Sequence, residues 1–238
     1  MTPRSRRADP LNRLVLFDVD GTVLSGGPAR ESFQIALQDV FGTAGPIDAW
    51  EFSGKTDPQI ARELLFEAGL ERSRVDAGLP VVWKRYLAEM EARLPKCPTQ
   101  ALPGVKGLLA LLDSCETVAL GLLTGNVVGG ARLKLGSAGL DGWLSEVGAF
   151  GSDHEARNEL PAIAIDRAEK HWGTRFSPAE VVVVGDTPRD VGCGRAHGTR
   201  TVAVATGRFG VEALTETGAD VVLESLRDTD RALRAILS

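Results

Sequence analysis

The sequence has few of the residues that would tie it to an extracellular or membrane setting. Its 238 residues include 3 cysteines, Cys97, Cys115 and Cys193, and none are spaced as Cys-x-x-Cys. So few cysteines, and an odd number of them, argue against a disulfide framework or a zinc knuckle and favour a reducing compartment. The longest uncharged run, residues 117–131, contains threonine, asparagine and several glycines. It is too short and too polar to span a bilayer.

The chain also lacks an excess of positive charge. It has 27 basic and 32 acidic side chains, a net charge of −5 and a pI of about 5.3. This balance gives no general attraction to nucleic acid or to an anionic membrane, so neither is expected as a partner. The basic residues 1–10 are followed only by a short apolar run that stops at Asp18, which argues against a signal peptide. We therefore expect a cytoplasmic protein, and the sequence does not indicate its oligomeric state.

Short apolar runs alternate with helical patterns over most of the chain. The helical patterns, such as Val105, Leu108, Leu109 and Leu112, repeat at intervals of three and four residues. Strands buried on both faces and separated by helices are typical of a doubly wound α/β fold with a mainly parallel sheet. The predicted strands are residues 14–17, 118–123, 181–184, 201–204 and, more weakly, 220–223.

The stretch from residue 25 to residue 100 interrupts this alternation with helices only. One helix has Phe33, Leu37 and Phe41 on its apolar face, and another is predicted to begin with Asp57 as N-cap and to end at Gly69. A third carries Val82, Tyr86 and Met90. We interpret residues 25–100 as a helical unit inserted into an α/β core formed by residues 1–24 and 101–238.

Polar residues follow the ends of the predicted strands, where open α/β sheets bind their ligands. Asp18 and Asp20 follow the first strand, Thr124 ends the second, and Asp186 and Asp190 follow the third. Clustered carboxylates need a compensating cation, and hard oxygen ligands favour Mg²⁺. The sequence therefore predicts a magnesium site at this edge of the sheet.

A metal beside a carboxylate, a hydroxyl group and a guanidinium suits phosphoryl transfer. Metal and arginine neutralise the phosphoryl oxygens, and one carboxylate can attack in line. Arg157 lies between the second and third of these strands and can supply the cation. Asp20 starts the loop that turns back over the strand end, where it could protonate a leaving alcohol and then activate water.

Three of these strand ends resemble motifs of the haloacid dehalogenase superfamily. Residues 17–24 (Phe-Asp-Val-Asp-Gly-Thr-Val-Leu) are similar to its first motif, residues 123–126 (Leu-Thr-Gly-Asn) to its second and residues 184–190 (Val-Gly-Asp-Thr-Pro-Arg-Asp) to its fourth. The order and the positions match over nearly the whole chain. The resemblance implies the fold of that superfamily, a Rossmann-like α/β core with an inserted cap.

The resemblance also implies roles for individual residues. Asp18 would be the nucleophile that becomes phosphorylated, Asp20 the general acid and base, and Thr124 a phosphate ligand. Magnesium would be held by Asp18, the Asp20 carbonyl and Asp186, with Asp190 in support. The residues expected to bind the phosphate or the substrate are Gly21, Thr22, Thr124, Gly125, Asn126, Arg157 and Lys55.

The chain departs from the family pattern at the third motif, which is usually a lysine shortly before a helix. Here the cation at that place is Arg157, and Lys170 comes a helix later. Arginine supplies the charge but differs from lysine in geometry. By this resemblance we assign to Arg157 the role of the family's lysine, which bridges the nucleophile and the phosphate.

The inserted unit resembles the helical cap of the branch that contains phosphoglycolate phosphatase and β-phosphoglucomutase. Residues 53–60 resemble the specificity loop of that cap, in which Lys55 could reach the non-reacting end of the substrate. Closure of such a cap excludes water from the site.

The function predicted from these features is a Mg²⁺-dependent phosphatase that acts on a small phosphorylated metabolite through an aspartyl-phosphate. The main alternative is a phosphomutase of the same fold. A haloalkanoate dehalogenase is disfavoured by Asp20, and a phosphonate hydrolase would need a Schiff-base lysine, for which Lys55 is the candidate. A non-catalytic phosphoacceptor such as a receiver domain would be shorter and would lack the helical insert.

Overall fold

A computed structural model describes residues 11–144 and 147–238 of the chain. The basic segment in which no signal peptide is expected, residues 1–10, lies outside this part. The strands are β1 (Arg13–Phe17), β2 (Leu24–Gly26), β3 (Thr99–Ala101), β4 (Val118–Thr124), β5 (Gly148–Phe150), β6 (Val181–Gly185), β7 (Arg200–Val204) and β8 (Val221–Leu223). The α-helices are α1 (Ala29–Phe41), α2 (Asp57–Glu67), α3 (Arg72–Arg93), α4 (Val105–Ser114), α5 (Val128–Ala138), α6 (Leu160–Trp172), α7 (Pro188–Ala196), α8 (Val211–Glu216) and α9 (Thr229–Leu237), and short 3-10 turns cover Ile47–Ala49, Arg157–Glu159 and Pro178–Glu180.

The main sheet of the described residues is parallel and has six strands in the order β5-β4-β1-β6-β7-β8. Strand β1 lies between β4 and β6, and its last residue, Phe17, is in register with Leu122 and Val184. The chain therefore passes to one side of β1 for β4 and β5 and to the other side for β6, β7 and β8. This reversal of direction leaves a crevice at the carboxyl ends of the central strands. The predicted doubly wound parallel fold is confirmed.

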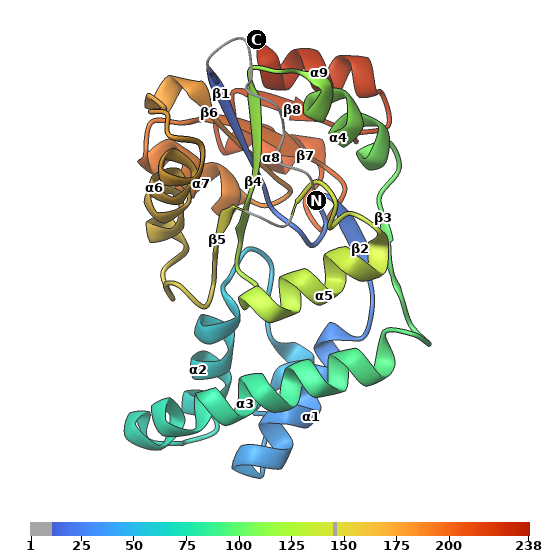
Figure 1. Cartoon of the computed structure of the whole chain (residues 1–238). Coiled ribbons are helices and arrows are strands. Elements are labelled where there is room, and N and C mark those ends of the chain that lie inside the picture. Colours follow the sequence, from blue (N-terminus) through green and yellow to red (C-terminus); the bar gives the residue numbers. More distant parts are fainter. Residues whose placement is uncertain (1–10, 145–146) are drawn as a thin grey trace.

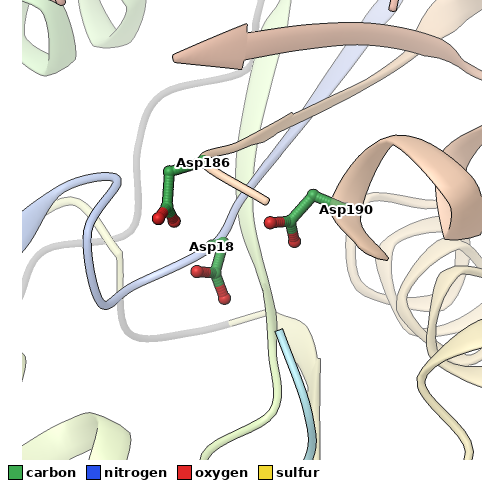
Figure 2. A group of neighbouring side chains, drawn as sticks. All are labelled: Asp18, Asp186 and Asp190. Carbon is green, nitrogen blue, oxygen red and sulfur yellow. The ribbon is translucent and has the colours of Figure 1, made fainter. Parts of the chain in front are cut away.

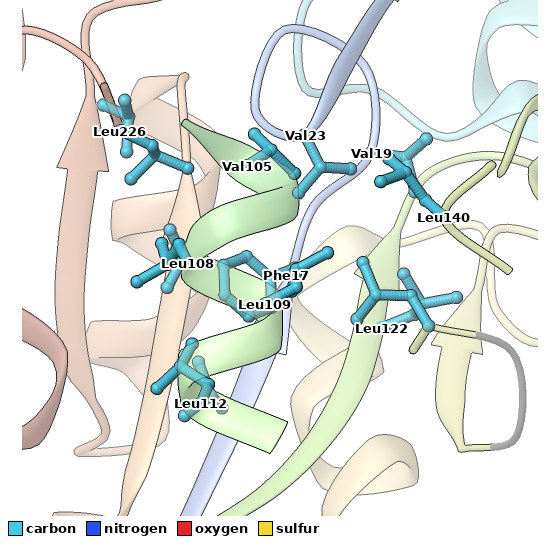
Figure 3. Close-up of a cluster of buried hydrophobic side chains, with 14 of the residues drawn as sticks. Phe17, Val19, Val23, Val105, Leu108, Leu109, Leu112, Leu122, Leu140 and Leu226 are labelled. Atoms are coloured by element: carbon cyan, nitrogen blue, oxygen red, sulfur yellow. The ribbon is translucent and has the colours of Figure 1, made fainter. Parts of the chain in front are cut away.

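Helices cover both faces of this sheet, and the side chains of β1 alternate between them. Val15 and Phe17 belong to a cluster that includes residues of α4 and α9, whereas Leu14 and Leu16 belong to a cluster with residues of α6 and α7 on the other face. Figure 3 shows Phe17 beside the α4 side chains Leu108 and Leu109. The four β1 side chains are fully buried. The continuous apolar run of the first strand is explained by this burial on both sides.

The sequence-based expectations differ from the structure in three local features. Residues 25–100 were expected to contain helices only, but β2 and β3 form a strand pair at the two ends of this stretch. Strand β5 was not expected, because its three residues, Gly-Ala-Phe, are too few to form a recognisable apolar run. The predicted N-cap of the second helix was also wrong by one residue. Thr56 is the N-cap of α2, since its Oγ1 accepts from the amide of Gln59 (3.2 Å), and Asp57 is the first helical residue.

The inserted stretch forms a helical layer below the carboxyl edge of the sheet, with α1, α2 and α3 grouped together (Figure 1). These helices bury a hydrophobic cluster of their own, which includes Phe33, Leu37, Leu64, Val82 and Met90. Strands β2 and β3, which pair with each other in antiparallel fashion, lie where the chain enters and leaves this layer. In the part of the chain that the structure describes, no helix is long and apolar enough to cross a membrane.

Candidate active site

Three buried carboxylates meet at the carboxyl edge of the sheet. Asp18 directly follows β1, Asp186 directly follows β6, and Asp190 lies in the first turn of α7 (Figure 2). One carboxylate oxygen from each lies within 4.8 Å of those of the other two. The adjacent positions of β1 and β6 in the sheet thus bring together residues that are 168 positions apart in the sequence.

Burial and mutual repulsion make these carboxylates hard to ionise. Burial raises the pKa of Asp18 to about 7, with Arg157 opposing this shift and Asp190 adding to it. Burial also raises the pKa of Asp186 to about 8, and the charges of Asp18 and Asp190 contribute to this rise. A cation among these oxygens would favour the ionised forms.

The arrangement of oxygen atoms fits a hard divalent cation. Asp186 Oδ1 accepts a hydrogen bond from the Thr22 hydroxyl (3.0 Å), whereas no described residue donates to Asp186 Oδ2 or Asp18 Oδ2. Asp186 Oδ2 faces two glycines, and a Cβ built at Gly207 would lie 1.7 Å from this oxygen. Glycine at these two positions lets the Asp186 carboxylate lie close to the backbone of both loops. All-oxygen ligands of this kind suit Mg²⁺.

Both carboxylate oxygens of Asp190 accept hydrogen bonds from other residues of the protein. Its Oδ2 accepts from the amide (3.0 Å) and the hydroxyl (2.7 Å) of Thr187 in a capping box at the start of α7. Its Oδ1 accepts from Arg157 Nη2. Asp190 therefore anchors α7 and Arg157 beside the open oxygens of Asp18 and Asp186.

Arg157 lies in the middle of the acidic cluster and is 6% exposed. Besides its contact with Asp190, Nη2 donates to Asp18 Oδ1 (2.9 Å), and Nη1 donates to the carbonyl of Gly54 (3.3 Å) in the inserted layer. Burial lowers the pKa of Arg157, but the Asp190 and Asp18 charges outweigh it and raise the pKa above its ordinary value. The structure thus brings Arg157 to Asp18, while Lys170 is 74% exposed and pairs with Asp166.

A second cation, which the sequence interpretation missed, lies on the Asp20 side of the site. Lys134 in α5 is 4% exposed, and its Nζ donates to Asp20 Oδ2 (2.7 Å) and to Asn126 Oδ1 (2.6 Å). The amide nitrogen of Asn126 in turn donates to Asp20 Oδ2 (2.8 Å) and to Thr124 Oγ1 (2.8 Å). The sequence does contain a pattern that indicates burial of Lys134. It lies on the same helix face as the small and apolar residues Ala131, Leu135 and Ala138, which form the buried face of α5.

The loop before α2 packs directly against the core. The Asp57 amide donates to the Gly125 carbonyl (2.7 Å), and the Val127 amide donates to Asp57 Oδ2 (2.8 Å). A Cβ on Gly125 would lie 2.1 Å from the Lys55 carbonyl oxygen, so only glycine allows this close approach. Asp57, predicted only as a helix cap, therefore joins the inserted layer to the start of α5.

A cavity of about 350 Å³ lies between the core and the inserted layer. The core contributes three of the carboxylates, both buried cations and a hydroxyl group: Asp18, Asp20, Asp186, Arg157, Lys134 and Thr124. About half of the lining residues of the inserted layer are apolar or aromatic, and the cations it adds are Arg30 and Lys55. The cavity is lined by Ala29, Arg30, Phe33, Phe52, Ser53, Gly54, Lys55, Asp57, Ile60 and Tyr86 of the inserted layer.

The two cations of the inserted layer differ in how their charges are balanced. Lys55 forms an ion pair with Glu63 and lies over the Trp50 ring, 5.4 Å from its centroid. Arg30 donates to the Ile47 carbonyl (2.6 Å) and lies over the Phe52 ring, and no described carboxylate pairs with it. Of the other predicted residues, Gly21, Gly125 and Asn126 line the cavity. Thr22 does not line it but donates a hydrogen bond to Asp186.

Comparisons with known proteins agree with this fold. A family model described as HAD-hydrolase-like matches residues 154–229, which contain Arg157 and the Asp186 loop. The chain is 29% identical over 225 residues to a phosphoglycolate phosphatase from Synechococcus elongatus, covering 94% of this chain and 98% of that one. In sequence and in fold, the chain is therefore similar to hydrolases of the haloacid dehalogenase type.

Solved structures of low sequence identity share the fold. A predicted phosphoglycolate phosphatase from Haemophilus somnus superimposes with a TM-score of 0.67 at 19% identity, covering 94% of this chain and 99% of that one. A hydrolase from Pseudomonas syringae gives a TM-score of 0.66 at 20% identity, with 95% and 99% covered. A protein from Bacteroides vulgatus that is provisionally named β-phosphoglucomutase gives 0.65 at 20% identity, with 95% and 89% covered.

Proposed function

We propose that this protein is a phosphatase that hydrolyses a small phosphorylated metabolite, of the phosphoglycolate phosphatase type, through a phosphorylated Asp18. The observation that carries the proposal is the position of Asp18, whose Oδ2 has no donor among the described residues while Oδ1 is held by Arg157. A carboxylate oxygen that is open to the cavity and flanked by a guanidinium is suited to attack a phosphorus atom.

The residues at the sheet edge would divide the reaction between them. Asp18 forms a bond to phosphorus as the bond from phosphorus to the substrate oxygen breaks, and Asp20 gives its proton to that oxygen. Asp20 then takes a proton from water, which attacks the aspartyl-phosphate and releases inorganic phosphate and free Asp18. Arg157 and the Thr124 hydroxyl, which both line the cavity, would bind the phosphoryl oxygens during both steps.

Asp18, the carbonyl of Asp20 and Asp186 would hold Mg²⁺, with Asp190 in support. When bound, the metal neutralises charge on the phosphoryl group and on the carboxylates around it. Residues 25–100 would form the cap domain and residues 1–24 and 101–238 the catalytic core. The separate hydrophobic cluster of α1, α2 and α3, and the cavity between these helices and the sheet edge, support this division.

A panel of phosphorylated metabolites that includes 2-phosphoglycolate tests the proposal, with phosphate release as the readout. We expect many turnovers per protein molecule, and we expect folded Asp18→Asn protein to show only the background rate, because the amide cannot attack phosphorus. Wild-type turnover by folded Asp18→Asn protein would exclude the aspartyl-phosphate. Conversion of a hexose 1-phosphate to its 6-phosphate without phosphate release would instead identify a phosphomutase.

A further inference from the structure

Two buried cations contact different carboxylates of the site. Arg157 contacts Asp18 and Asp190, whereas Lys134 contacts Asp20. The superfamily pattern expects one cation, beside the nucleophile. The second cation thus has no role in the reaction as proposed above.

The contacts of Lys134 fix the Asp20 carboxylate in one orientation. The Asp20 side chain is 45% exposed, and it stands on the turn after β1, where a carboxylate would otherwise rotate. Both of its described donors, Lys134 Nζ and Asn126 Nδ2, bind the same oxygen, Oδ2. Oδ1 is thereby left for the substrate.

Lys134 also determines how Asn126 is oriented. An ammonium group can only donate, so the oxygen of the Asn126 amide must face Lys134 and its nitrogen must face Asp20 and Thr124. One lysine thus orders the acid/base carboxylate, the amide and the hydroxyl beside it. Burial lowers the pKa of Lys134, but Asp20, Tyr86 and Asp57 outweigh it and the net shift is upward, so the ammonium stays charged.

We propose that Lys134 is a positioning residue for general acid catalysis, which holds Asp20 Oδ2 so that Oδ1 protonates the leaving oxygen of the substrate. The inference rests on the proposed phosphatase function. It differs from a direct contact with the phosphoryl group, because a lysine on the phosphate would assist every phosphate ester to a similar degree. A lysine that acts through Asp20 assists only those esters whose leaving oxygen needs a proton.

The test compares two substrates by kcat/KM, which reports on the steps up to phosphorylation of the enzyme. Ethyl phosphate has a strongly basic leaving group, and p-nitrophenyl phosphate has a weakly basic one that departs without a proton. We expect Lys134→Met to lower kcat/KM for ethyl phosphate on the order of 10²-fold or more, the usual contribution of general acid catalysis. For p-nitrophenyl phosphate we expect a change of only a few-fold.

Several controls make the result specific. Lys170→Met removes an exposed lysine that pairs with Asp166 and should change neither value. In an Asp20→Asn background, Lys134→Met should cost nothing further with ethyl phosphate, because the residue it positions is already lost. Lys134→Arg should restore part of the ethyl phosphate rate.

Two outcomes would overturn the proposal. An equal loss with both substrates would mean that Lys134 supports the fold or binds the phosphoryl group, and an additional loss in the Asp20→Asn background would mean that it does not act through Asp20. If Lys134→Met does not fold, Lys134→Gln and Asn126→Ala are tested with the same pair of substrates and the same expectation. A wild-type protein that releases phosphate from neither ester and from no member of the metabolite panel would instead refute the phosphatase function itself.

Discussion

The two walls of the cavity differ in how their charges are balanced. On the core wall, Asp18 and Asp186 each have a carboxylate oxygen without a described donor, and burial raises the pKa of both groups. On the wall formed by the inserted layer, Lys55 is neutralised by Glu63, Arg30 has no described carboxylate partner, and about half of the lining residues are apolar or aromatic. The unpaired carboxylate oxygens of the core wall can bind a metal ion, whereas the opposite wall contributes an apolar surface and the cation Arg30. Substitutions in the core should therefore affect kcat, and substitutions opposite should affect KM.

Arg157→Ala, on the core wall, should lower kcat far more than any substitution on the opposite wall. Loss of a charge that stabilises the transferring phosphoryl group should lower kcat on the order of 10²–10³-fold, about 3–4 kcal/mol. Arg157→Lys should recover part of this loss, because lysine restores the positive charge but cannot form the bidentate hydrogen bonds of a guanidinium. Steady-state kinetics at saturating substrate measures both variants.

The control for Arg157 is Lys170→Ala, which removes an exposed cation and should leave kcat within a few-fold of wild type. Removal of one partner from a buried ion pair also destabilises a protein by about 3–5 kcal/mol. Thermal unfolding must therefore show that each variant is folded. A folded Arg157→Ala protein with near-normal kcat would show that the charge on the core wall is not used in catalysis.

Magnesium should stabilise the protein, and more strongly as the pH rises. The folded state raises the pKa of Asp18 from 3.8 to about 7 and that of Asp186 from 3.8 to about 8, in both cases chiefly through burial. The folded metal-free protein therefore keeps protons that the unfolded chain releases. The stability from these groups falls as the pH increases from about 4 to about 8. Metal binding requires the ionised forms, so its affinity increases over the upper part of this range.

Thermal unfolding with and without MgCl₂ at pH 6 and pH 8 measures this effect. With the metal at about one hundred times its Kd, the gain is about 2.7 kcal/mol, or roughly 5–10 °C for a chain of this size. Asp186→Asn should abolish most of the gain, and EDTA should remove both the gain and the activity. A magnesium effect that is equal at the two pH values, or that persists in Asp186→Asn, would place the metal elsewhere.

The wall formed by the inserted layer should give the smallest effects. Arg30→Met removes a cation with no described carboxylate partner and should raise KM roughly tenfold for a substrate with an anionic distal group, the range for one charge-assisted hydrogen bond. Lys55→Met removes a charge that Glu63 already balances and should change KM by less than a few-fold. Both variants should keep kcat close to wild type. A larger effect at Lys55 than at Arg30 would reverse this assignment and favour the specificity-loop role predicted for Lys55.

The parts of this arrangement that follow from local patterns could be predicted from the sequence. The buried strands and the acidic residues just after them were visible because apolar runs end abruptly at Asp18 and Asp186, and parallel strands share one carboxyl edge. Lys134 could not be placed by strand position, because it lies in a helix and reaches Asp20 across the fold. The ion pair that neutralises Lys55, and the lack of a described carboxylate partner for Arg30, also depend on how the loops and helices of the inserted layer pack, which the sequence pattern does not contain.

The paired contacts between Asp57 and the start of α5 have a consequence for measuring motion. The Asp57 amide donates to Gly125 and the Val127 amide donates to Asp57, so two backbone protons are shielded only while the two walls touch. Their exchange with deuterium therefore counts the openings of the cavity, separately from global unfolding. Comparison of that opening rate with the turnover number will show whether admission of substrate or the chemical step limits the enzyme.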